Sequence, residues 1–375
     1  MPLRVLHCPS NTAGHSQGLA SAERRLGLKS RQVSFEPHPY GYETDEVLYA
    51  GCTGELGRQF KRWGLVWRAL RDFDVVHFNF GQSILPSPIR NRTRSFTAGI
   101  ANAYYRVTGM ADLPVLKWAG KGIIVTYQGD DARQGRFCQE HFPISPAGEV
   151  EEGYYSSATD AHKQQMIGQM ARYADRIYAL NPDLLHVLPS HARFLPYGHV
   201  DLAEWRPSTV RKGTGNAPVV VHAPSHRGIK GTRFLLEAVQ RLQTEGVRFQ
   251  FDLVENMPRT AARHIYERAD LIVDQLLCGW YGGLAVECMA LGKPVVAYIR
   301  ETDLVFIPPG MRAELPLIQA TPQTIYQVLK EWLTEKRHQL HEIGQRSRLF
   351  VERWHDPLKI AQILKHDYED ISRRR

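Results

Sequence analysis

Residues 279–296 read GWYGGLAVECMALGKPVV, and the interpretation of the whole chain starts from this stretch. Its glycines predict a turn, and residues 284–291 predict one short helix because their apolar members recur at helical spacing. Gly292 suits the left-handed position at which a helix ends, and Pro294 cannot continue a helix. Residues 295–297 are typical of a buried parallel strand.

A glycine turn that opens a helix favours the binding of an anion. It presents backbone N–H groups and the positive end of the helix dipole, which together suit a phosphate. The candidate contacts at this turn are Tyr281, Gly282, Gly283 and Leu284. Glu287 lies one turn into the predicted helix, where its carboxylate could reach hydroxyl groups of the molecule that carries the phosphate. The alternative is a simple packing unit with Glu287 solvated.

Strand and helix signals alternate along the whole chain, which indicates an α/β protein with parallel sheets. The 375 residues suggest two or more domains, and 43% hydrophobic with 23% charged residues is ordinary for a globular protein. No run of about 18 apolar residues exists, and the first ten residues lack the apolar core of a signal peptide. Five scattered cysteines without CxxC spacing fit a reducing cytoplasm and make a disulfide framework or zinc site unexpected.

The charge balance is basic, with 47 Lys and Arg against 39 Asp and Glu and a formal charge of +8. Such a balance suits an anionic ligand, an anionic membrane face or nucleic acid. No zinc-finger spacing and no RNA-recognition motif is present, so a nucleic-acid partner is not expected.

Residues 57–73, GRQFKRWGLVWRALRDF, predict a basic amphipathic helix with two interpretations. In the first, the helix packs on a sheet and its basic face is solvated. In the second, the helix contacts a membrane surface, which would make the protein peripheral on the inner face of the membrane.

The stretch at 279–296 resembles the C-terminal signature of family-four glycosyltransferases, which have the GT-B fold. In that signature a glycine-rich turn, a helix with a glutamate, a small-residue turn and a Lys/Thr-Pro-Val-Val strand follow one another. The similarity covers most of the chain and is strongest over 218–296. It implies two Rossmann-like domains whose parallel sheets face each other across a cleft. It also implies transfer of a sugar, with retention at the anomeric carbon, from a nucleoside diphosphate sugar.

The resemblance implies no separate cofactor and no obligatory metal, since the nucleoside diphosphate sugar is itself the donor substrate. Asp130 and Asp131, adjacent carboxylates without further ligands, are weak evidence for a metal site. The implied acceptor is a glycan, a lipid-linked molecule or a small molecule, and the implied setting is synthesis of cell-surface polysaccharide or glycan. Two rival functions stay open: a sugar-nucleotide epimerase or hydrolase of the same fold, and a protein that binds a sugar nucleotide without turnover.

The resemblance also suggests domain boundaries. We expect an N-terminal acceptor-side domain over 1–197, a nucleotide-sugar-binding domain over 198–356, and a C-terminal helix over about 357–375 that crosses back to the first domain. The segment 194–207, FLPYGHVDLAEWRP, and the polar residues 208–216 after it are typical of an interdomain linker. The segment is similar to the Pro-x-Gly-Val-Asp connection of GT-B proteins.

Two loops of the second domain carry further candidate donor contacts. Arg227 and Lys230 lie where the family places an Arg and a Lys against the donor diphosphate. Physically, two cations beside a helix N-terminus would neutralise charge on a departing nucleoside diphosphate. Ser225 stands near the usual position of the arginine, so Lys230 is the firmer match of the two. Asn256 follows a predicted strand at the carboxyl edge of the sheet, where ligands of such folds bind.

Glu287 matches the second glutamate of a pair that resembles a clamp on the donor ribose. The first glutamate should lie eight residues earlier, and that position is Gly279. This departure leaves open how the hydroxyls of the donor sugar are held, and hence which sugar is used. Trp280, Tyr281 and the amides of the next two glycines are the substitutes that the sequence offers.

The first domain contributes three candidates at strand ends. Gly14 lies in the polar loop after the first strand and is a candidate donor contact. His77 resembles the histidine of the family's Asp-Val-Val-His strand, with a structural strand-end histidine as the alternative. A histidine often found after a later strand aligns with Gln128, which can bond the sugar but cannot act as a general base. A retaining reaction does not strictly need that base, because the leaving phosphate can take the acceptor's proton.

Overall fold

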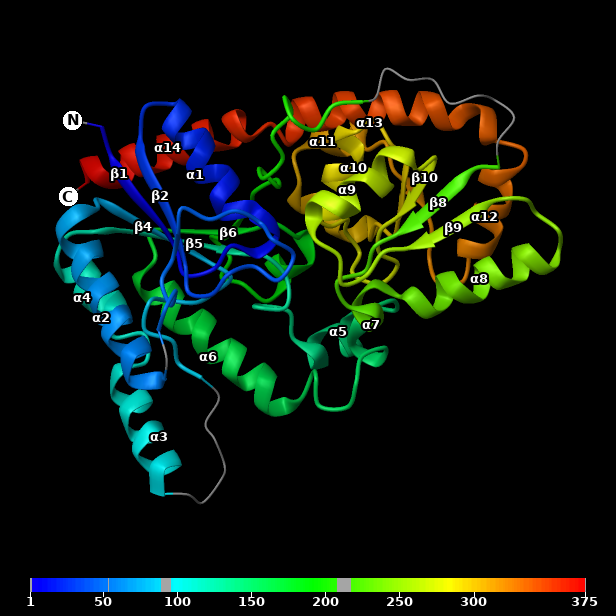
Figure 1. Ribbon diagram of the computed structural model, residues 1–375. Helices are drawn as coiled ribbons and strands as arrows, with labels where there is room; N and C mark the ends of the chain where they lie inside the picture. The colour runs from blue at the N-terminus through cyan, green and yellow to red at the C-terminus, as the bar shows by residue number, and fades with distance from the viewer. Residues whose placement is uncertain (1, 53, 89–95, 208–216, 375) are drawn as a thin grey trace. The chain divides into compact units, whose positions relative to one another are not determined.

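Two parallel β-sheets organise the chain, and contacts between residues divide it into two units (Figure 1). The computed structural model describes residues 2–52, 54–88, 96–207 and 217–374. The first unit comprises Met1–Gln134, Ser157–His199 and Pro357–Arg375, and the second comprises Gly135–Ser156 and Val200–Asp356. The predicted α/β class with parallel sheets is confirmed.

The first unit contains a seven-stranded sheet in the order β3-β2-β1-β4-β5-β6-β7. Its strands are β1 (Arg4–Cys8), β2 (Lys29–Ser34), β3 (Glu46–Val47), β4 (Val75–Asn79), β5 (Gly122–Tyr127), β6 (Arg176–Ala179) and β7 (Arg193–Phe194). All pairs are parallel, as where Val5 pairs with Val75 and Val76 with Ile123. The central strands β4 and β5 are buried along their whole length, which explains their nearly continuous apolar sequence. The winding reverses between β1 and β4.

Helices cover both faces of the first sheet. They are α1 (His15–Arg25), α2 (Glu55–Asp72), α3 (Phe96–Thr108), α4 (Asp112–Trp118), α6 (Ser157–Tyr173) and α14 (Pro357–Arg373), with 3-10 turns at Thr12–Gly14 and Pro182–His186. The hydrophobic core lies between the sheet and α2, α4 and α6. On the other face α14 packs along α1, and Asp367 of α14 accepts from Arg176 Nε of β6 at 3.0 Å.

The second unit contains a five-stranded parallel sheet in the order β12-β11-β10-β8-β9. Its strands are β8 (Val219–His222), β9 (Gln250–Leu253), β10 (Leu271–Val273), β11 (Val295–Ala297) and β12 (Ile318–Gln319). In chain order this is the 2-1-3-4-5 arrangement of doubly wound folds, whose winding reverses between the first and third strands. That reversal lies between β8 and β10.

The helices of the second unit also flank their sheet on two sides. They are α5 (Gly135–His141), α7 (Arg227–Lys230), α8 (Thr232–Thr244), α9 (Arg259–Arg268), α10 (Gly283–Ala290), α11 (Pro309–Glu314), α12 (Ile325–Leu333) and α13 (Leu340–Trp354), with 3-10 turns at Pro146–Gly148, Glu301–Phe306 and Arg337–Gln339. The side chains of α8 and α12 form one hydrophobic core with the sheet, while α10 packs against α13 and β11.

The stretch at 279–296 folds as its sequence predicts. A glycine turn leads into α10, the helix ends before Gly292 with φ at +70°, and β11 follows. The helix begins and ends one residue earlier than predicted, which is within the usual fraying of helix ends.

Residues 135–156 group with the second unit, although the sequence analysis places them in the first domain. Two contacts hold them there: Arg233 forms a bidentate ion pair with Glu149, and Arg300 Nη2 donates to the Ile144 carbonyl at 2.9 Å. Their partners lie more than 80 residues away in the chain, so local sequence could not reveal the grouping. The polar linker residues 208–216 lie outside the described residues.

None of the helices in the described part of the chain combines the length and the apolar character that crossing a bilayer requires.

Candidate functional site

The carboxyl edge of the second unit's sheet is the position at which its topology predicts a ligand site. Open α/β sheets bind ligands outside the strand ends where the winding reverses, which here is between β8 and β10. The chain leaves β8 at His222 and continues into α7, whose last residue is Lys230. It leaves β10 at Val273 and continues into Asp274 and Gln275. Residues from these two loops meet at this point.

Lys230 is held in place by two side chains from the loop after β10. Its Nζ lies 3.1 Å from Asp274 Oδ1 and donates to Gln275 Oε1 at 2.7 Å. The Asp274 side chain is fully buried, whereas 12% of the Lys230 side chain is exposed. The Gln275 amide also donates to the Trp280 carbonyl, which ties this loop to the turn before α10. The ammonium group is therefore fixed, with part of its surface open to solvent.

The turn before α10 packs against the ion pair of Lys230 with Asp274. The Gly282 N–H donates to Asp274 Oδ2 at 2.6 Å. A Cβ on residue 282 would lie 2.9 Å from Lys230 Nζ, so glycine lets the ammonium group lie beside the helix start. No side chain caps α10, its first N–H groups have no acceptor within the helix, and Gly283 and Leu284 are partly exposed. An ammonium group beside helix N–H groups suits an anion such as a diphosphate.

Glu287 lies one turn into α10 and is paired with an arginine. Its Oε1 accepts from Arg259 Nε at 2.9 Å, and only 4% of the Glu287 side chain is exposed. Arg259 opens α9, the helix that follows β9. The carboxylate that we expect to hold a ribose is thus oriented by a neighbouring guanidinium group.

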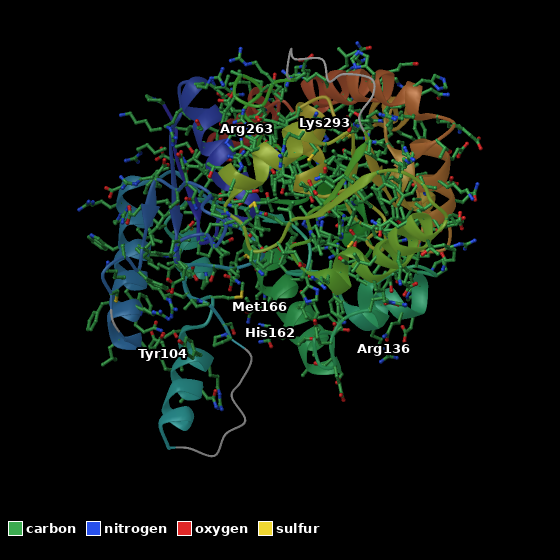
Figure 2. All side chains as sticks on the ribbon, turned by 45° about the vertical axis from the view of Figure 1, so that its right-hand side comes forward. Tyr104, Arg136, His162, Met166, Arg263 and Lys293 are labelled. Atoms are coloured by element: carbon green, nitrogen blue, oxygen red, sulfur yellow. The ribbon has the colours of Figure 1, made fainter. Side chains whose placement is uncertain are left out.

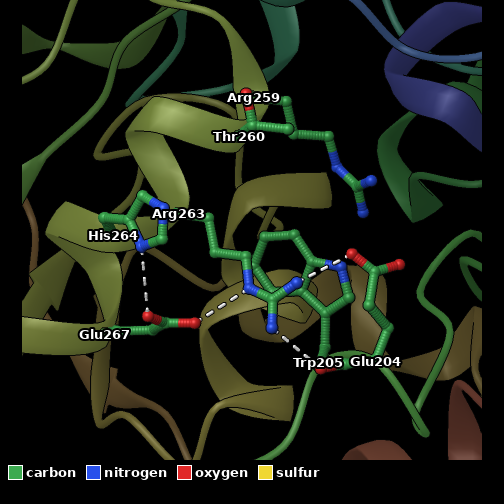
Figure 3. A pocket seen from close by; sticks show the side chains of 7 residues that line it. All are labelled: Glu204, Trp205, Arg259, Thr260, Arg263, His264 and Glu267. Atoms are coloured by element: carbon green, nitrogen blue, oxygen red, sulfur yellow. Dashed lines mark hydrogen bonds and ion pairs between the residues drawn. The ribbon is translucent and has the colours of Figure 1, made fainter.

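Arg259 also lines an open pocket of about 290 Å³ on the second unit (Figure 3). The pocket is lined by Glu204, Trp205, Arg259, Thr260, Arg263, His264 and Glu267. The guanidinium groups of Arg259 and Arg263 lie 4.7 and 5.0 Å from the centre of the Trp205 ring. Arg263 is neutralised by Glu204 and Glu267, at 2.7 and 2.9 Å, so the pocket carries little net positive charge.

Arg227 and Asn256 occupy neighbouring loops but are not gathered around Lys230. Arg227 forms a bidentate pair with Glu255 at 2.8 and 2.5 Å, and 58% of its side chain is exposed. This exposed pair keeps the pKa of Glu255 below its ordinary value. Asn256, the next residue, is exposed with φ at +51°. Lys230 is consequently the cation that the fold fixes beside α10.

Gly279, which stands where the family carries its first glutamate, has no room for a side chain. Its φ of +76° disfavours any residue with a Cβ, and such a Cβ would lie 2.7 Å from Arg300 Nη1. Arg300 is buried, pairs with Asp303 at 2.8 Å, and stacks on the Phe142 ring at 3.6 Å. A guanidinium group therefore fills the space beside Gly279.

Tyr281 contributes its backbone to the turn, while its side chain points into the unit. Its ring stacks on Trp280 with centroids 4.4 Å apart, and its hydroxyl lies 2.8 Å from His355 Nε2. Both rings are fully buried, so neither is a substitute for the missing glutamate in this structure.

His77 lies inside the first unit, and its contacts favour the structural alternative. Tyr368 Oη donates to Glu23 at 2.8 Å and accepts from His77 Nδ1 at 2.8 Å. His77 Nε2 then accepts from Thr126 Oγ1 at 2.7 Å. Burial lowers the pKa of His77 well below its ordinary value, so the ring is neutral. With both nitrogens bonded and no exposed surface, His77 is left out of the site proposed below.

Gln128 and Gly14 lie near the edge of the first sheet where β1 and β4 end. Gln128 is nearly buried, and its Nε2 donates to Asn79 Oδ1 at 3.4 Å. Gly14 is the N-cap of α1, and the Tyr42 ring lies against it. Asp131, three residues after Gln128, is partly buried, and its burial raises its pKa to about 6. Its carboxylate accepts the Gln128 and Gly129 N–H groups.

Three candidate site residues were not predicted from the sequence: Asp274, Gln275 and Arg259. A signal existed for the first two, since a polar pair follows directly after a buried strand and precedes the glycine turn. No local signal marks Arg259, because its partner Glu287 is 28 residues away. Within the described residues, no cluster of three His, Cys, Asp or Glu side chains is arranged to hold a metal.

His222, at the end of β8, provides a test of the packing beside the site. Its Nδ1–H donates to the Val273 carbonyl and its Nε2 accepts from Thr232, both at 2.8 Å. Burial lowers the pKa of His222 from 6.5 to about 4. Between those values the unfolded chain holds a proton that the folded chain lacks, so this group's contribution to stability falls as pH falls. We expect a slope of up to about 1.4 kcal/mol per pH unit.

The measurement is the free energy of unfolding of the wild type minus that of His222→Gln, from denaturant titrations at pH 4 to 7. The carboxyls of Asp112 and Asp131, whose pKa values burial raises to about 6, change the stability in the opposite direction as pH falls, but they are common to both proteins. If the free energies of unfolding of the two proteins change with pH in parallel, His222 is not held neutral in the folded protein.

Comparisons with known proteins identify the fold. No protein-family model matches the chain. No curated protein matches it either. Solved structures do match over the whole length. Sucrose-phosphate synthase from Thermosynechococcus elongatus is 13% identical, with a TM-score of 0.59 and 100% of both chains covered. HepE from Anabaena, in complex with UDP-glucose, is 13% identical with a TM-score of 0.60, covering 99% of this chain and 100% of that one.

A third structure, the catalytic domain of starch synthase IV from Arabidopsis thaliana bound to ADP and acarbose, is 11% identical. Its TM-score is 0.58, and 100% of both chains is covered. The chain has the GT-B fold. We interpret two parts of this fold functionally: the doubly wound sheet of the second unit, and the residues that meet at its winding reversal between β8 and β10.

Proposed function

We propose that the protein is a glycosyltransferase whose donor is a nucleoside diphosphate sugar. The observation that carries this proposal is the position of Lys230, fixed by Asp274 and Gln275 against the glycine start of α10. This position offers an ammonium group, helix N–H groups and, one turn further, the Glu287 carboxylate. These groups suit a diphosphate joined to a ribose. The GT-B neighbours bound to UDP-glucose and to ADP support the same class of ligand.

In the proposed reaction, Lys230 and the first N–H groups of α10 stabilise the negative charge that grows on the departing nucleoside diphosphate. The leaving phosphate takes the acceptor's proton on the same face of the sugar, which gives retention at the anomeric carbon. Gly282, Gly283 and Leu284 contribute their backbone, and Glu287 holds the ribose. Arg227 contacts the diphosphate only if its guanidinium group gives up the ion pair with Glu255. Gln128 and Gly14 remain candidates for contacts on the first unit.

The finer assignment follows the sequence resemblance. A family-four-like enzyme would transfer a hexose to a glycan, lipid-linked or small-molecule acceptor in the cytoplasm, during synthesis of cell-surface polysaccharide or glycan. The absence of a nucleic-acid partner stays an expectation from the sequence. The division at residues 197/198 likewise stays a proposal, with 135–156 reassigned to the second unit.

The test is consumption of sugar nucleotides by the purified protein, with and without an acceptor panel of oligosaccharides and polyprenyl-linked sugars. Transfer predicts consumption that depends on the acceptor, with an anomeric configuration in the product that matches the donor. Consumption without acceptor would indicate the epimerase or hydrolase alternative instead. Binding without consumption across the panel would indicate a protein that only binds sugar nucleotides.

We expect turnover to survive chelation of divalent metal ions, because Lys230 and the α10 N–H groups already supply the positive charge that a diphosphate requires. Initial rates with and without excess EDTA should agree within about twofold, far below the 100-fold loss typical of removing a group that stabilises the leaving charge. A rate abolished by EDTA and restored by Mg²⁺ or Mn²⁺ would contradict this expectation.

A further inference from the structure

Large apolar side chains are exposed mainly on three helices of the first unit, α2, α3 and α4. Figure 1 labels these helices. Among the described residues ten such side chains stand out to solvent, and seven of them lie on α2, α3 and α4. The seven are Leu56, Phe60, Trp63, Trp67, Val107, Val115 and Trp118. Exposed apolar residues scattered singly are normal, but a group of them on adjacent helices marks an interaction surface.

Four of these residues form a stripe along α2. Leu56, Phe60, Trp63 and Trp67 are spaced four, three and four residues apart, which places them on one face of the helix. They are 79%, 78%, 42% and 63% exposed. A different face of α2, carrying Leu65 and Val66 among others, is already buried in the core. The stripe is therefore not needed to pack the helix onto its own unit.

Helix α3 extends this surface through the polar tips of its aromatic residues. Trp63 Nε1 donates to Tyr104 Oη at 3.0 Å, and Tyr104 Oη donates to Gln59 at 2.9 Å. Tyr105 Oη donates to Glu55 at 2.8 Å. Figure 2 labels Tyr104 in this region of the first unit. The two helices are thus joined by hydrogen bonds, while the Trp63 ring stays partly exposed between them.

Helix α2 carries five basic and two acidic residues. Four of the basic side chains are ion-paired: Arg62 with Glu55 at 3.1 Å, Arg71 with Asp72 at 2.8 Å, Arg58 with Glu36 at 3.2 Å and Arg68 with Glu46 at 2.7 Å. The fifth, Lys61, is exposed beside the stripe, and so is Arg106 on α3. A partner of this surface should therefore be apolar at its centre and negatively charged around it.

We propose that the α2–α3 face docks on an anionic lipid bilayer. We define this face by its apolar and aromatic residues Leu56, Phe60, Trp63, Trp67 and Tyr104, and by the basic residues Lys61, Arg71 and Arg106. Tryptophan and tyrosine combine an apolar ring with a polar tip, and such residues gather at the boundary between lipid headgroups and acyl chains. Amphipathic helices with basic residues lie in that boundary and bind anionic lipid more strongly than neutral lipid. This charge complementarity favours a bilayer over a protein partner. The proposal does not depend on the glycosyltransferase activity.

The test is co-sedimentation of the full chain with phosphatidylcholine vesicles that contain or lack phosphatidylglycerol, at low and high salt. The wild type should bind the anionic vesicles at low salt, and binding should weaken with added salt. Phe60→Ser with Trp67→Ser should lower the partition coefficient by about tenfold or more, because two inserted side chains are lost. Lys61→Ala with Arg71→Ala should lower it by about fivefold for each charge removed, and only for anionic vesicles.

The matched control is Val305→Ser with Leu349→Ser, which removes two exposed apolar side chains of the second unit, 72% and 64% exposed. It should bind as the wild type does. Absence of wild-type binding at low salt, an unchanged partition coefficient in Phe60→Ser/Trp67→Ser, or an equal loss in the control would each overturn the proposal. Self-association that is abolished by the same double substitution, without vesicle binding, would show a protein interface instead and would overturn it too.

Discussion

Replacing Lys230 with alanine is expected to lower turnover by about 100- to 1,000-fold, the loss seen when one group that stabilises developing negative charge is removed. The reason is geometric. The ammonium group is held at 2.7 Å by Gln275 and at 3.1 Å by Asp274, beside the start of α10, so it does not have to be ordered during the reaction. The measurement is kcat and KM for the donor that the consumption assay identifies.

The control must separate chemistry from structure, because Lys230→Ala also leaves the buried Asp274 carboxylate without its cation. An unpaired buried charge costs about 3–5 kcal/mol of stability. The double variant Lys230→Ala/Asp274→Asn also removes the charge of Asp274. Compared with Lys230→Ala, the double variant should be more stable but should have no higher turnover. Asp274→Asn alone keeps the ammonium group and should lose less turnover than Lys230→Ala. A double variant with nearly wild-type turnover would show that Lys230 serves only to balance Asp274.

Local sequence was sufficient for the fold and for the turn before α10. Alternating strand and helix signals and the glycine-helix-strand order at 279–296 depend on neighbours in the chain, and both are confirmed. The position of the turn at the reversal between β8 and β10 adds a reason for ligand binding that the sequence alone could not supply.

Contacts between side chains that are far apart in the chain could not be predicted from local sequence. Lys230 and Asp274 are 44 residues apart, and Arg259 and Glu287 are 28 apart. The sequence assigned Lys230 and Glu287 to the site but gave no indication of what orients them. Conversely, the resemblance of residues 74–77 to the family's Asp-Val-Val-His strand made His77 a catalytic candidate. The hydroxyl that occupies its Nδ1 comes from α14, 291 residues further along the chain.

The structure gives a physical reason for glycine at 279, where the family that the sequence resembles carries a glutamate. Gly279 has a positive φ and lies against the buried Arg300, so a glutamate there would need both a strained backbone and a displaced guanidinium group. Glycine at 279 therefore fits the arginine at 300. Restoring glutamate alone is not expected to restore a second hydroxyl clamp.

Glu287→Gln is expected to weaken donor binding by about 1.5–3 kcal/mol, the range for a hydrogen bond to a charged group. The substitution keeps the shape of the side chain and removes the charge that would accept from the ribose hydroxyls. A 2′-deoxyribose donor should lose affinity for the wild type and lose little more for the variant, because both changes delete the same contact. Calorimetric titration of both donors into both proteins measures the coupling.

Arg259 supplies the control for this experiment, since Glu287 accepts a hydrogen bond from its Nε at 2.9 Å. If Glu287 acts only by anchoring α9 to α10, Arg259→Gln should weaken donor binding as much as Glu287→Gln does, and the deoxy donor should add its full loss in both variants. If Glu287 binds the ribose directly, Arg259→Gln should preserve the preference for the 2′-hydroxyl, because the carboxylate remains. If the affinity losses from Glu287→Gln and from the 2′-deoxy donor add, the carboxylate serves only the ion pair with Arg259. If the preference for the 2′-hydroxyl disappears in Glu287→Gln but persists in Arg259→Gln, the carboxylate binds the donor ribose.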